Sequence, residues 1–407
     1  MTPNDASHLG MDTLLVHSGL DFPVGRAQPA VPPIVPSVGY VHPTMAETDA
    51  ALGYAGGTPA DPNRYVYARH GGPNQAALEE AVAALEGAAS AVSFSSGMAA
   101  LHAALLALVP PGGVVVAAEQ IYGVTHSLLD WMASVMGLQV HYVDFLDEEA
   151  ARAAIREMRP ACVLCEVLTN PLARVVAVDA IAKAAHEVGA RLLVDNTFTT
   201  PFLVRPLALG ADVVAHSSTK FLNGHGDVLG GVVAGPADLM QIVYQHRRLL
   251  GAMPSAFDAW LTLRGMRTLA LRMRQACANA REIAAWFSRQ KRIARVYYPG
   301  LPTDECYGRA QALFRADHFG SMIAFEIAGL DRAGAFAFVE RLRLIRPVTS
   351  LGDVFSLILH PASSSHRALT PQQREALGIR EGTLRLSVGI EDAADLIADL
   401  EQALRSL

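Results

Sequence analysis

Between about residues 75 and 235, short runs rich in valine and leucine alternate with alanine-rich stretches of helical length. We expect strands to begin near Ala91, Val114, Val140, Cys162, Leu192 and Val213. This alternation is typical of an α/β fold with a mostly parallel central sheet, because each parallel strand needs a crossover, usually a helix, to reach the next. The runs are continuously apolar, so the sequence predicts strands that are covered on both faces.

Polar residues stand where five of these apolar runs stop. They are Ser95 with Ser96, Tyr122, Asn170, Asp195 and Ser217. Open α/β sheets bind their ligands outside the carboxyl ends of the strands. The sequence therefore predicts one shared site at this edge of the sheet.

The remainder of the chain predicts a second, smaller unit. Residues 228–234 follow Lys220 after a turn too short for a helical crossover, which indicates an antiparallel strand. Beyond Pro254 we expect one long helix over residues 261–287, and then a mixture of strands near 321–327 and 384–388 with helices near 334–343 and 393–404. This pattern predicts a large domain over residues 61–255 and a small α+β domain over 256–407.

The first 60 residues are rich in proline, glycine and short polar breaks. Proline excludes long helices from such a segment, so residues 1–60 are predicted to form an extended arm. An arm that buries little of its own surface is expected to pack against another body, here a neighbouring subunit.

Composition narrows the possible partners and the compartment. The 407 residues include 18% charged residues and carry a formal net charge of -6, so neither nucleic acid nor a membrane surface is expected as a partner. Residues 1–16 do not resemble a signal peptide, and the apolar residues 98–109 are too few to span a bilayer. We expect a cytoplasmic protein that binds a small molecule and copies of itself.

Neither the cysteines nor the histidines predict a metal or redox site. Cys162 and Cys165 have redox-motif spacing, but they fall in a predicted buried strand and are expected to be core thiols. Four cysteines in this length form no disulfide framework. His360 and His366 match no metal-ligand spacing, so no metal is predicted.

Lys220 and Asp195 suggest a specific cofactor. Lys220 ends the segment His216-Ser217-Ser218-Thr219-Lys220, and Asp195 closes the apolar run of a neighbouring strand. A lysine amine, clustered hydroxyls and a buried carboxylate suit pyridoxal 5'-phosphate (PLP), as the Schiff-base amine, the phosphate donors and the partner of the pyridinium nitrogen. The alternatives are a surface lysine that follows a strand and an aspartate that caps its own turn.

Other segments allow a binding role and a purely structural one. The amides of Gly97 and Met98 would lie in the unpaired first turn of a helix, where they suit a phosphate, although Ser96 could simply be the helix cap. Tyr122 could stack on a planar cofactor or pack in the core. Arg385 could grip a substrate carboxylate or lie on a solvated strand face.

With these residues in place, the chain resembles the Cys/Met-metabolism PLP-dependent family from about Thr13 to the C-terminus. That family includes methionine γ-lyase, cystathionine γ-lyase, cystathionine γ-synthase and the homoserine-ester sulfhydrylases. The resemblance is carried by Tyr67-Ala68-Arg69, Ser95-Ser96-Gly97-Met98, Val194-Asp195-Asn196-Thr197-Phe198, Ser217-Ser218-Thr219-Lys220, Ser350-Leu351-Gly352, His360-Pro361-Ala362 and Leu384-Arg385-Leu386-Ser387-Val388-Gly389. It implies the aspartate-aminotransferase-like fold, fold type I, with residues 61–255 as the PLP-binding domain.

The resemblance also implies roles for single residues. Lys220 would hold the cofactor and shuttle protons, Asp195 would hold the ring nitrogen, and Tyr122 would stack on the ring. Tyr67 and Arg69 would reach the phosphate in a neighbouring subunit, in a homotetramer built from two active dimers. The phosphate would be bound by Gly97, Met98, Ser217 and Thr219, and the substrate carboxylate and the cofactor's hydroxyl side by Asn170, Ser350 and Arg385.

Three positions depart from the family pattern. Gly72-Pro73-Asn74 follows Arg69 where Asn-Pro-Thr is usual. Val124 stands where many methionine γ-lyases carry a cysteine, and Thr349 replaces a glutamate of many cystathionine enzymes. The change at Thr349 weakens recognition of a substrate with a second amino group.

The expected reaction is γ-elimination of methionine or a related thioether to 2-oxobutanoate, ammonia and a thiol. The same residues would serve γ-replacement on an O-acyl-homoserine, as in a cystathionine γ-synthase or sulfhydrylase, or the cleavage of cystathionine by a γ-lyase. Two alternative hypotheses remain. The protein could be an aminotransferase, or it could be a non-catalytic protein that keeps the fold.

Overall fold

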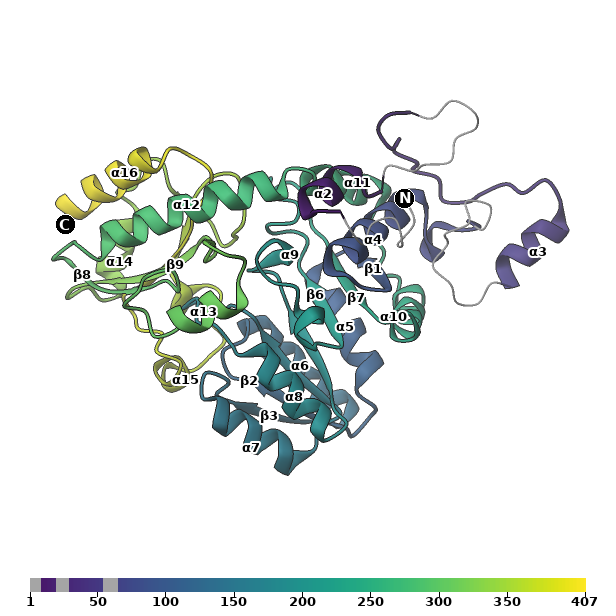
Figure 1. The fold of residues 1–407 in the computed structure, drawn as a ribbon, viewed down its shortest axis with the longest axis horizontal. Coiled ribbons are helices and arrows are strands. Elements are labelled where there is room, and N and C mark those ends of the chain that lie inside the picture. Colours follow the sequence, from purple (N-terminus) through teal and green to yellow (C-terminus); the bar gives the residue numbers. More distant parts are fainter. Residues whose placement is uncertain (1–8, 20–28, 54–64) are drawn as a thin grey trace.

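The structure is a computed structural model, and it describes residues 9–19, 29–53 and 65–407. Figure 1 shows two sheets with helices packed around them. The strands are β1 (Ser90–Phe94), β2 (Val114–Ala118), β3 (Gln139–Val143), β4 (Cys162–Glu166), β5 (Arg191–Asp195), β6 (Val213–His216), β7 (Gly231–Gly235), β8 (Ile293–Tyr297), β9 (Met322–Ile327), β10 (Arg346–Pro347), β11 (Leu357–Leu359) and β12 (Thr383–Ser387).

The helices alternate with these strands through the first half of the chain. The α-helices are α2 (Met11–His17), α3 (Met45–Gly53), α4 (Pro73–Glu86), α5 (Gly97–Leu108), α6 (Gly123–Met136), α7 (Glu148–Met158), α8 (Val178–Glu187), α9 (Thr200–Leu203), α10 (Ala237–Leu250), α11 (Ala256–Met266), α12 (Leu269–Phe287), α13 (Tyr307–Leu313), α14 (Arg332–Val339), α15 (Pro371–Ala376) and α16 (Ala393–Arg405). The short 3-10 helices are η2 (Ala68–His70), η3 (Pro206–Leu209) and η4 (Pro361–Ser363).

The first sheet has seven strands in the order β1-β7-β6-β5-β4-β2-β3. Its strands are parallel except β7, which runs antiparallel between β1 and β6. The prediction of a mostly parallel α/β sheet with one antiparallel strand is therefore confirmed. Glu166 pairs with Asp195, and Asp195 with Ala215, so the carboxyl ends of β4, β5 and β6 meet at one edge.

Burial on both faces, as the continuous apolar runs predicted, is confirmed for the inner strands, although β5 begins with the exposed Arg191, and it was wrong for the edge strand β3, whose residues are exposed or half-buried. Every residue of β4, β6 and β7 is buried. Cys162 and Cys165 lie inside β4 as free, fully buried thiols, and burial raises the pKa of Cys162 to about 12. The prediction of core thiols is confirmed by the complete burial of both side chains, and burial keeps such thiols protonated at neutral pH.

The strands from β8 onward form the second sheet, in the order β10-β11-β12-β9-β8 and mostly antiparallel. The predicted strands near 321–327 and 384–388 are β9 and β12, and the predicted helices are α14 and α16. The predicted single helix over 261–287 was wrong, because α11 ends at Met266 and α12 begins at Leu269. The carbonyl of Gly265 accepts from the Thr268 backbone N–H at 3.2 Å and from the Arg272 guanidinium at 2.9 Å, which ends α11.

Part of the segment before α4 contacts the rest of the molecule, and part of it projects outward. The Trp260 indole donates to the carbonyl of Pro32 at 2.8 Å, and Gly39 pairs with Tyr67 in a short bridge. Helix α3 stands away from the rest of the molecule at the right of Figure 1. The predicted arm over 1–60 lies partly outside the described residues. Among the residues described, no helix is both long and apolar enough to cross a membrane.

Candidate active site

A cavity of about 570 Å³ lies at the carboxyl ends of the first sheet, and residues from the later part of the chain, among them Thr349, Ser364 and Arg385, also line it. Its size is typical of a pocket for a cofactor with a small substrate. The predicted site residues that line it are Gly97, Met98, Tyr122, Asn170, Asp195, Ser217, Thr219, Lys220 and Arg385. The convergence of the strand ends on one cavity follows from the shared direction of β4, β5 and β6.

Lys220 presents its amine to this cavity. It follows β6 by four residues, and its Nζ donates to the Ser350 hydroxyl at 2.9 Å. Burial and the nearby charge of Arg385 lower the pKa of Lys220, which favours the neutral amine. The chain has only two other lysines, Lys183 and Lys291, and both are exposed.

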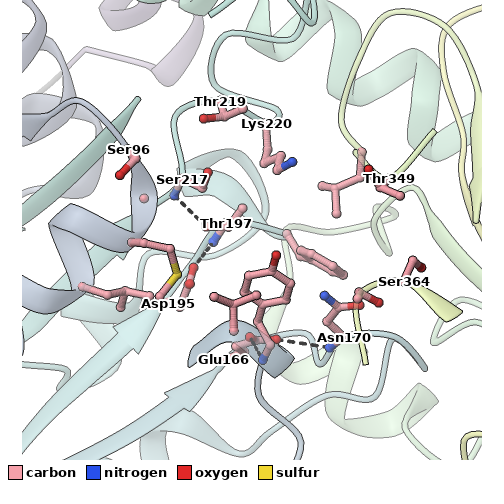
Figure 2. Close-up of a pocket in the computed structure, with 18 of the residues that line it drawn as sticks. Ser96, Glu166, Asn170, Asp195, Thr197, Ser217, Thr219, Lys220, Thr349 and Ser364 are labelled. Atoms are coloured by element: carbon pink, nitrogen blue, oxygen red, sulfur yellow. Dashed lines mark hydrogen bonds between the residues drawn. The ribbon is translucent and has the colours of Figure 1, made fainter. Parts of the chain in front are cut away.

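Asp195 ends β5 on the floor of the same cavity (Figure 2). One carboxylate oxygen accepts from the Thr197 backbone N–H at 2.9 Å, and the Thr197 hydroxyl in turn accepts from the Ser217 N–H at 2.8 Å. Burial raises the pKa of Asp195 above its ordinary value. A buried carboxylate of this kind gains from a cationic partner.

The N-terminus of α5 lies directly against Ser217. Ser96 caps the helix, because its hydroxyl accepts from the Ala99 N–H at 3.2 Å. A Cβ on Gly97 would lie 2.7 Å from the Cβ of Ser217, so only glycine allows this approach. The Thr219 hydroxyl is held between the N–H and the carbonyl of Gly230, at 2.9 and 3.2 Å. Free helix N–H groups beside hydroxyls make a site suited to a phosphate.

Sequence reasoning missed Glu166, the last residue of β4. Its two oxygens accept from the backbone N–H groups of Tyr122 at 2.7 Å and Asn170 at 3.1 Å, and thereby fix both residues at the cavity. Burial and the nearby charge of Asp195 raise the pKa of Glu166 well above its ordinary value. The signal was available, because Glu166 is a single acid inside the apolar run that continues through Val167 and Leu168.

Arg385 on β12 is buried, so the alternative of a solvated strand face was wrong. Its guanidinium donates to Asn170 Oδ1 at 2.8 Å and to the Ser350 carbonyl at 3.0 Å, and it lies 5.8 Å from the centre of the Phe198 ring. Burial lowers its pKa to about 10, so the charge persists at neutral pH. Its Nε is buried without a hydrogen-bond partner in the described part of the chain.

Three predicted residues lie outside the cavity lining. Ser350 reaches the site only through its bonds to Lys220 and Arg385. Tyr67 is 44% exposed, and the Arg69 guanidinium donates to the carbonyl of Arg248 at 2.9 Å. Neither Tyr67 nor Arg69 belongs to the lining of the cavity in its own chain.

Ser363 at the end of η4 and three residues of the loop that follows, Ser364, Ser365 and Arg367, also line the cavity. None of them was predicted as a site residue. A Cβ on Gly123 would lie 2.4 Å from the Ser365 carbonyl oxygen, so the loop packs directly against the start of α6. His360 and His366, which flank the serines, bond to Ser363 and Ser365 at 2.9 Å each. Over residues 9–19, 29–53 and 65–407, no cluster of three His, Cys, Asp or Glu side chains is placed to hold a metal ion.

Comparison with known proteins agrees with this geometry. The chain is 39% identical over 405 residues to the O-succinylhomoserine sulfhydrylase of Pseudomonas aeruginosa, covering 99% of this chain and 97% of the relative. It is 42% identical to an L-methionine γ-lyase of Porphyromonas gingivalis, covering 84% of this chain and 86% of the relative. The structure of the cystathionine γ-synthase of Xanthomonas oryzae in complex with cystathionine matches with a TM-score of 0.90 at 37% identity, over 98% of this chain and 100% of that one.

These relatives include a lyase as well as a sulfhydrylase and a γ-synthase. The structural match confirms the prediction of fold type I. The sequence profile of one family, described as Cys/Met metabolism PLP-dependent enzymes, matches residues 12–405. The chain therefore belongs to the Cys/Met-metabolism enzymes that depend on pyridoxal phosphate.

Proposed function

We propose that this protein removes the substituent on the γ-carbon of an α-amino acid, with Lys220 as the base and pyridoxal phosphate as the cofactor. Without a thiol acceptor the reaction is γ-elimination, in which methionine or a related thioether takes up water and yields 2-oxobutanoate, ammonia and a thiol. The observation that supports this best is the placement of the Lys220 amine, the Asp195 carboxylate and the α5 N-terminus around one cavity.

The residues present fit the cofactor. The α5 N-terminus with Ser217 and Thr219 suits its phosphate, where the close approach of Gly97 leaves the helix N–H groups accessible. The half-buried Asp195 suits a protonated ring nitrogen, and Lys220 is the only lysine of the chain on the cavity. When bound, the cofactor withdraws electrons from the substrate's α-carbon.

Lys220 is placed to act as a single base for two carbons. Loss of a γ-substituent requires removal of a proton from Cα and then from Cβ, and one flexible amine can reach both neighbouring atoms. The lowered pKa of Lys220 leaves more of the amine neutral, and thus able to accept a proton, than in an exposed lysine. The bond to Ser350 orients the amine.

Tyr122 and Arg385 are placed to hold and assist the substrate. Burial raises the pKa of the Tyr122 phenol, so it is protonated at neutral pH and can donate to a leaving thiol. Glu166 fixes the backbone of Tyr122. Arg385, held by Asn170 and Ser350, can bind the α-carboxylate through a charge-assisted pair.

A second candidate is γ-replacement, in which a thiol takes the place of the acyl group of an O-acyl-homoserine. It is supported by the match to an O-succinylhomoserine sulfhydrylase along 99% of this chain. Cleavage of cystathionine would use the same residues, but Thr349 offers no carboxylate to a second ammonium group.

A substrate panel tests the proposed function. Purified holoenzyme is assayed with methionine, cystathionine, and O-acetyl- and O-succinylhomoserine, each with and without a thiol. We expect 2-oxobutanoate without any amino acceptor, and a thioether product from the esters when thiol is present. Transfer of the amino group that requires an acceptor oxo acid would identify an aminotransferase instead. Absence of turnover with every substrate would show that the fold is kept without this activity.

We further propose that the smallest active unit is a dimer, two of which form a tetramer in the cytoplasm. Residues 1–60 would form the arm that contacts the neighbour, and domains 61–255 and 256–407 would enclose each site. Tyr67 and Arg69 lie outside the cavity of their own chain, and Tyr67 is exposed. Both could therefore reach the phosphate in a neighbouring subunit.

Mixing two inactive variants tests the shared site. Lys220→Ala and Arg69→Ala homo-oligomers are each expected to be nearly inactive, because each variant lacks one of the two residues in every site. Hybrids formed by denaturing and refolding the two together would contain some sites with both residues intact, and activity should reappear. A mixture that stays as inactive as its parents, despite hybrids shown by native mass spectrometry, would place Arg69 outside the neighbour's site.

A further inference from the structure

We propose that Arg367 selects substrates whose γ-substituent carries a carboxylate, so that the preferred substrate is a homoserine ester of a dicarboxylic acid, with O-succinylhomoserine as the four-carbon case. This inference rests on the proposed function, because it concerns the group that leaves the γ-carbon. The inference is drawn from the position of Arg367, an arginine that has no role in the proposed binding of the cofactor or of the α-carboxylate.

Arg367 lines the cavity from a firmly held loop. Its backbone N–H donates to the Ser364 carbonyl at 3.2 Å, and the N–H of His366 donates to the Pro361 carbonyl at 3.0 Å. The His366 side chain is fully buried, and burial with the nearby charge of Arg385 lowers its pKa to about 3, so it adds no charge of its own. The exposed Arg367 side chain therefore extends from a fixed point.

Three basic residues line the cavity, and Arg367 is the one whose side chain has no bonding partner in the described part of the chain. Lys220 bonds to Ser350, and Arg385 bonds to Asn170 and Ser350. No ion pair or side-chain hydrogen bond of Arg367 occurs within the described part of the chain. The two carboxylates of the lining, Glu166 and Asp195, accept backbone N–H groups on the floor. An unpaired guanidinium beside a ligand cavity is suited to an anionic ligand group.

The loop of Arg367 lies on the substrate side of the cavity. Figure 2 places Ser364 across the cavity from Ser96, which marks the N-terminus of α5 where the cofactor phosphate is proposed to bind. A phosphate bound there would be held by the N–H groups of α5 with Ser217 and Thr219, and would not need Arg367. The anion for Arg367 therefore belongs to the substrate.

The polar residues that line the cavity on the side of Ser364 discriminate among the candidate substrates. Thr349 and Ser363 to Ser365 are neutral, so this side of the lining offers no carboxylate to an ammonium group. Cystathionine carries both an ammonium and a carboxylate at its far end, and only the carboxylate would find a partner. The methyl of methionine and the acetyl group of O-acetylhomoserine leave Arg367 unpaired. A succinyl ester satisfies it without adding an unmatched charge.

The proposed replacement needs only the ester and the thiol as reactants. The bond from Cγ to the ester oxygen breaks, succinate leaves with that oxygen, and the thiol sulfur bonds to Cγ while its proton is released. Since Arg367 is exposed, water screens its attraction, and we expect a contribution to kcat/KM of about tenfold rather than the several hundredfold of a buried pair.

The test compares Arg367→Gln with the wild-type holoenzyme on O-succinyl- and O-acetylhomoserine in the presence of a thiol. The variant should lose about tenfold in kcat/KM for the succinyl ester, mostly through KM, and change less than about twofold for the acetyl ester. Arg367→Lys should keep part of the preference, because it retains the charge but not the planar fork. Rising salt should reduce the wild-type preference and leave that of Arg367→Gln unchanged.

Arg289→Gln is the matched control, since Arg289 is an exposed arginine outside the cavity. Unchanged cofactor absorbance and melting temperature in Arg367→Gln would show that the fold and the holoenzyme are intact. Equal preference for the two esters in wild type, or an equal loss on both in the variant, would overturn the role of Arg367 while the proposed function stands. Turnover of thioethers without turnover of either ester would also overturn the role of Arg367. Failure on every γ-substituted substrate would remove the proposed function and this inference together.

Discussion

Lys220→Ala is expected to reduce turnover of every substrate on the order of 10⁴-fold or more, because the change removes both the amine that holds the cofactor and the base that moves the protons. No other lysine can substitute. Lys183 and Lys291 are exposed, and neither lines the cavity. The rate is measured as 2-oxobutanoate release from purified variant protein supplied with the cofactor.

Two further measurements distinguish a chemical role of Lys220 from a structural one. Added small primary amines should restore part of the rate to Lys220→Ala, since they supply the missing base to a site that is otherwise intact. Lys183→Ala, an exposed lysine of α8, should keep full activity. A Lys220→Ala protein with more than about one tenth of the wild-type rate would be incompatible with a proton carrier worth at least 10²-fold.

The pH dependence follows from the direction of the shift. A lysine whose pKa is lowered in the folded protein loses its proton at a lower pH than an exposed lysine, so the neutral amine is available earlier. The rate of cofactor loading should therefore rise with pH and level off below the pH expected of an ordinary lysine. Stopped-flow absorbance after mixing cofactor with the cofactor-free protein gives this profile.

Asp195→Asn is expected to lower kcat by about 10²- to 10³-fold, as when one preorganised electrostatic contact is removed. Asparagine keeps the size and shape of the side chain and removes only the negative charge. The loss should fall on kcat, because the neutral amide no longer stabilises the positive charge on the ring nitrogen. Asp179→Asn, an exposed acid in the first turn of α8, is the matched control.

Asp195→Asn should reduce the stabilisation that the cofactor gives without destabilising the cofactor-free protein. The pKa of Asp195 is raised by burial, so the folded state favours its neutral form and the carboxylate destabilises the cofactor-free protein at neutral pH. Asparagine removes that penalty, and the cofactor-free variant should melt no lower than wild type. The gain in melting temperature on cofactor binding should be smaller in the variant. An equal gain in both proteins would contradict a cationic partner for Asp195.

The strand alternation allowed much of this site to be predicted. Parallel strands align their carboxyl ends, so Asp195 and Ser217 could be placed together with Asn170 from apolar runs alone. Lys220 and Arg385 were also identified, although the surroundings of Arg385 depend on a contact between β12 and the loop that follows β4. That contact joins residues 215 positions apart, at Asn170 and Arg385, and no local pattern reveals it.

Other features could not be found from local patterns. The break between α11 and α12 is made by Arg272, whose side chain turns back to the Gly265 carbonyl and also binds the carbonyl of Phe221. The helical periodicity on either side is uninterrupted, so the sequence favours one helix. The loop with Arg367 is a similar case. Its packing against the cavity includes the close approach of Ser365 to Gly123, two residues far apart in the sequence, so no local pattern reveals it.

The most direct test of the central claim is borohydride reduction of the holoenzyme followed by peptide mapping. The chain contains three lysines, so the assignment has few alternatives and two internal controls. We predict one stable adduct per chain on the peptide that contains Lys220, and its absence from the Lys220→Ala protein. An adduct on Lys183 or Lys291, or no adduct in a protein that retains the absorbance of bound cofactor, would contradict the account.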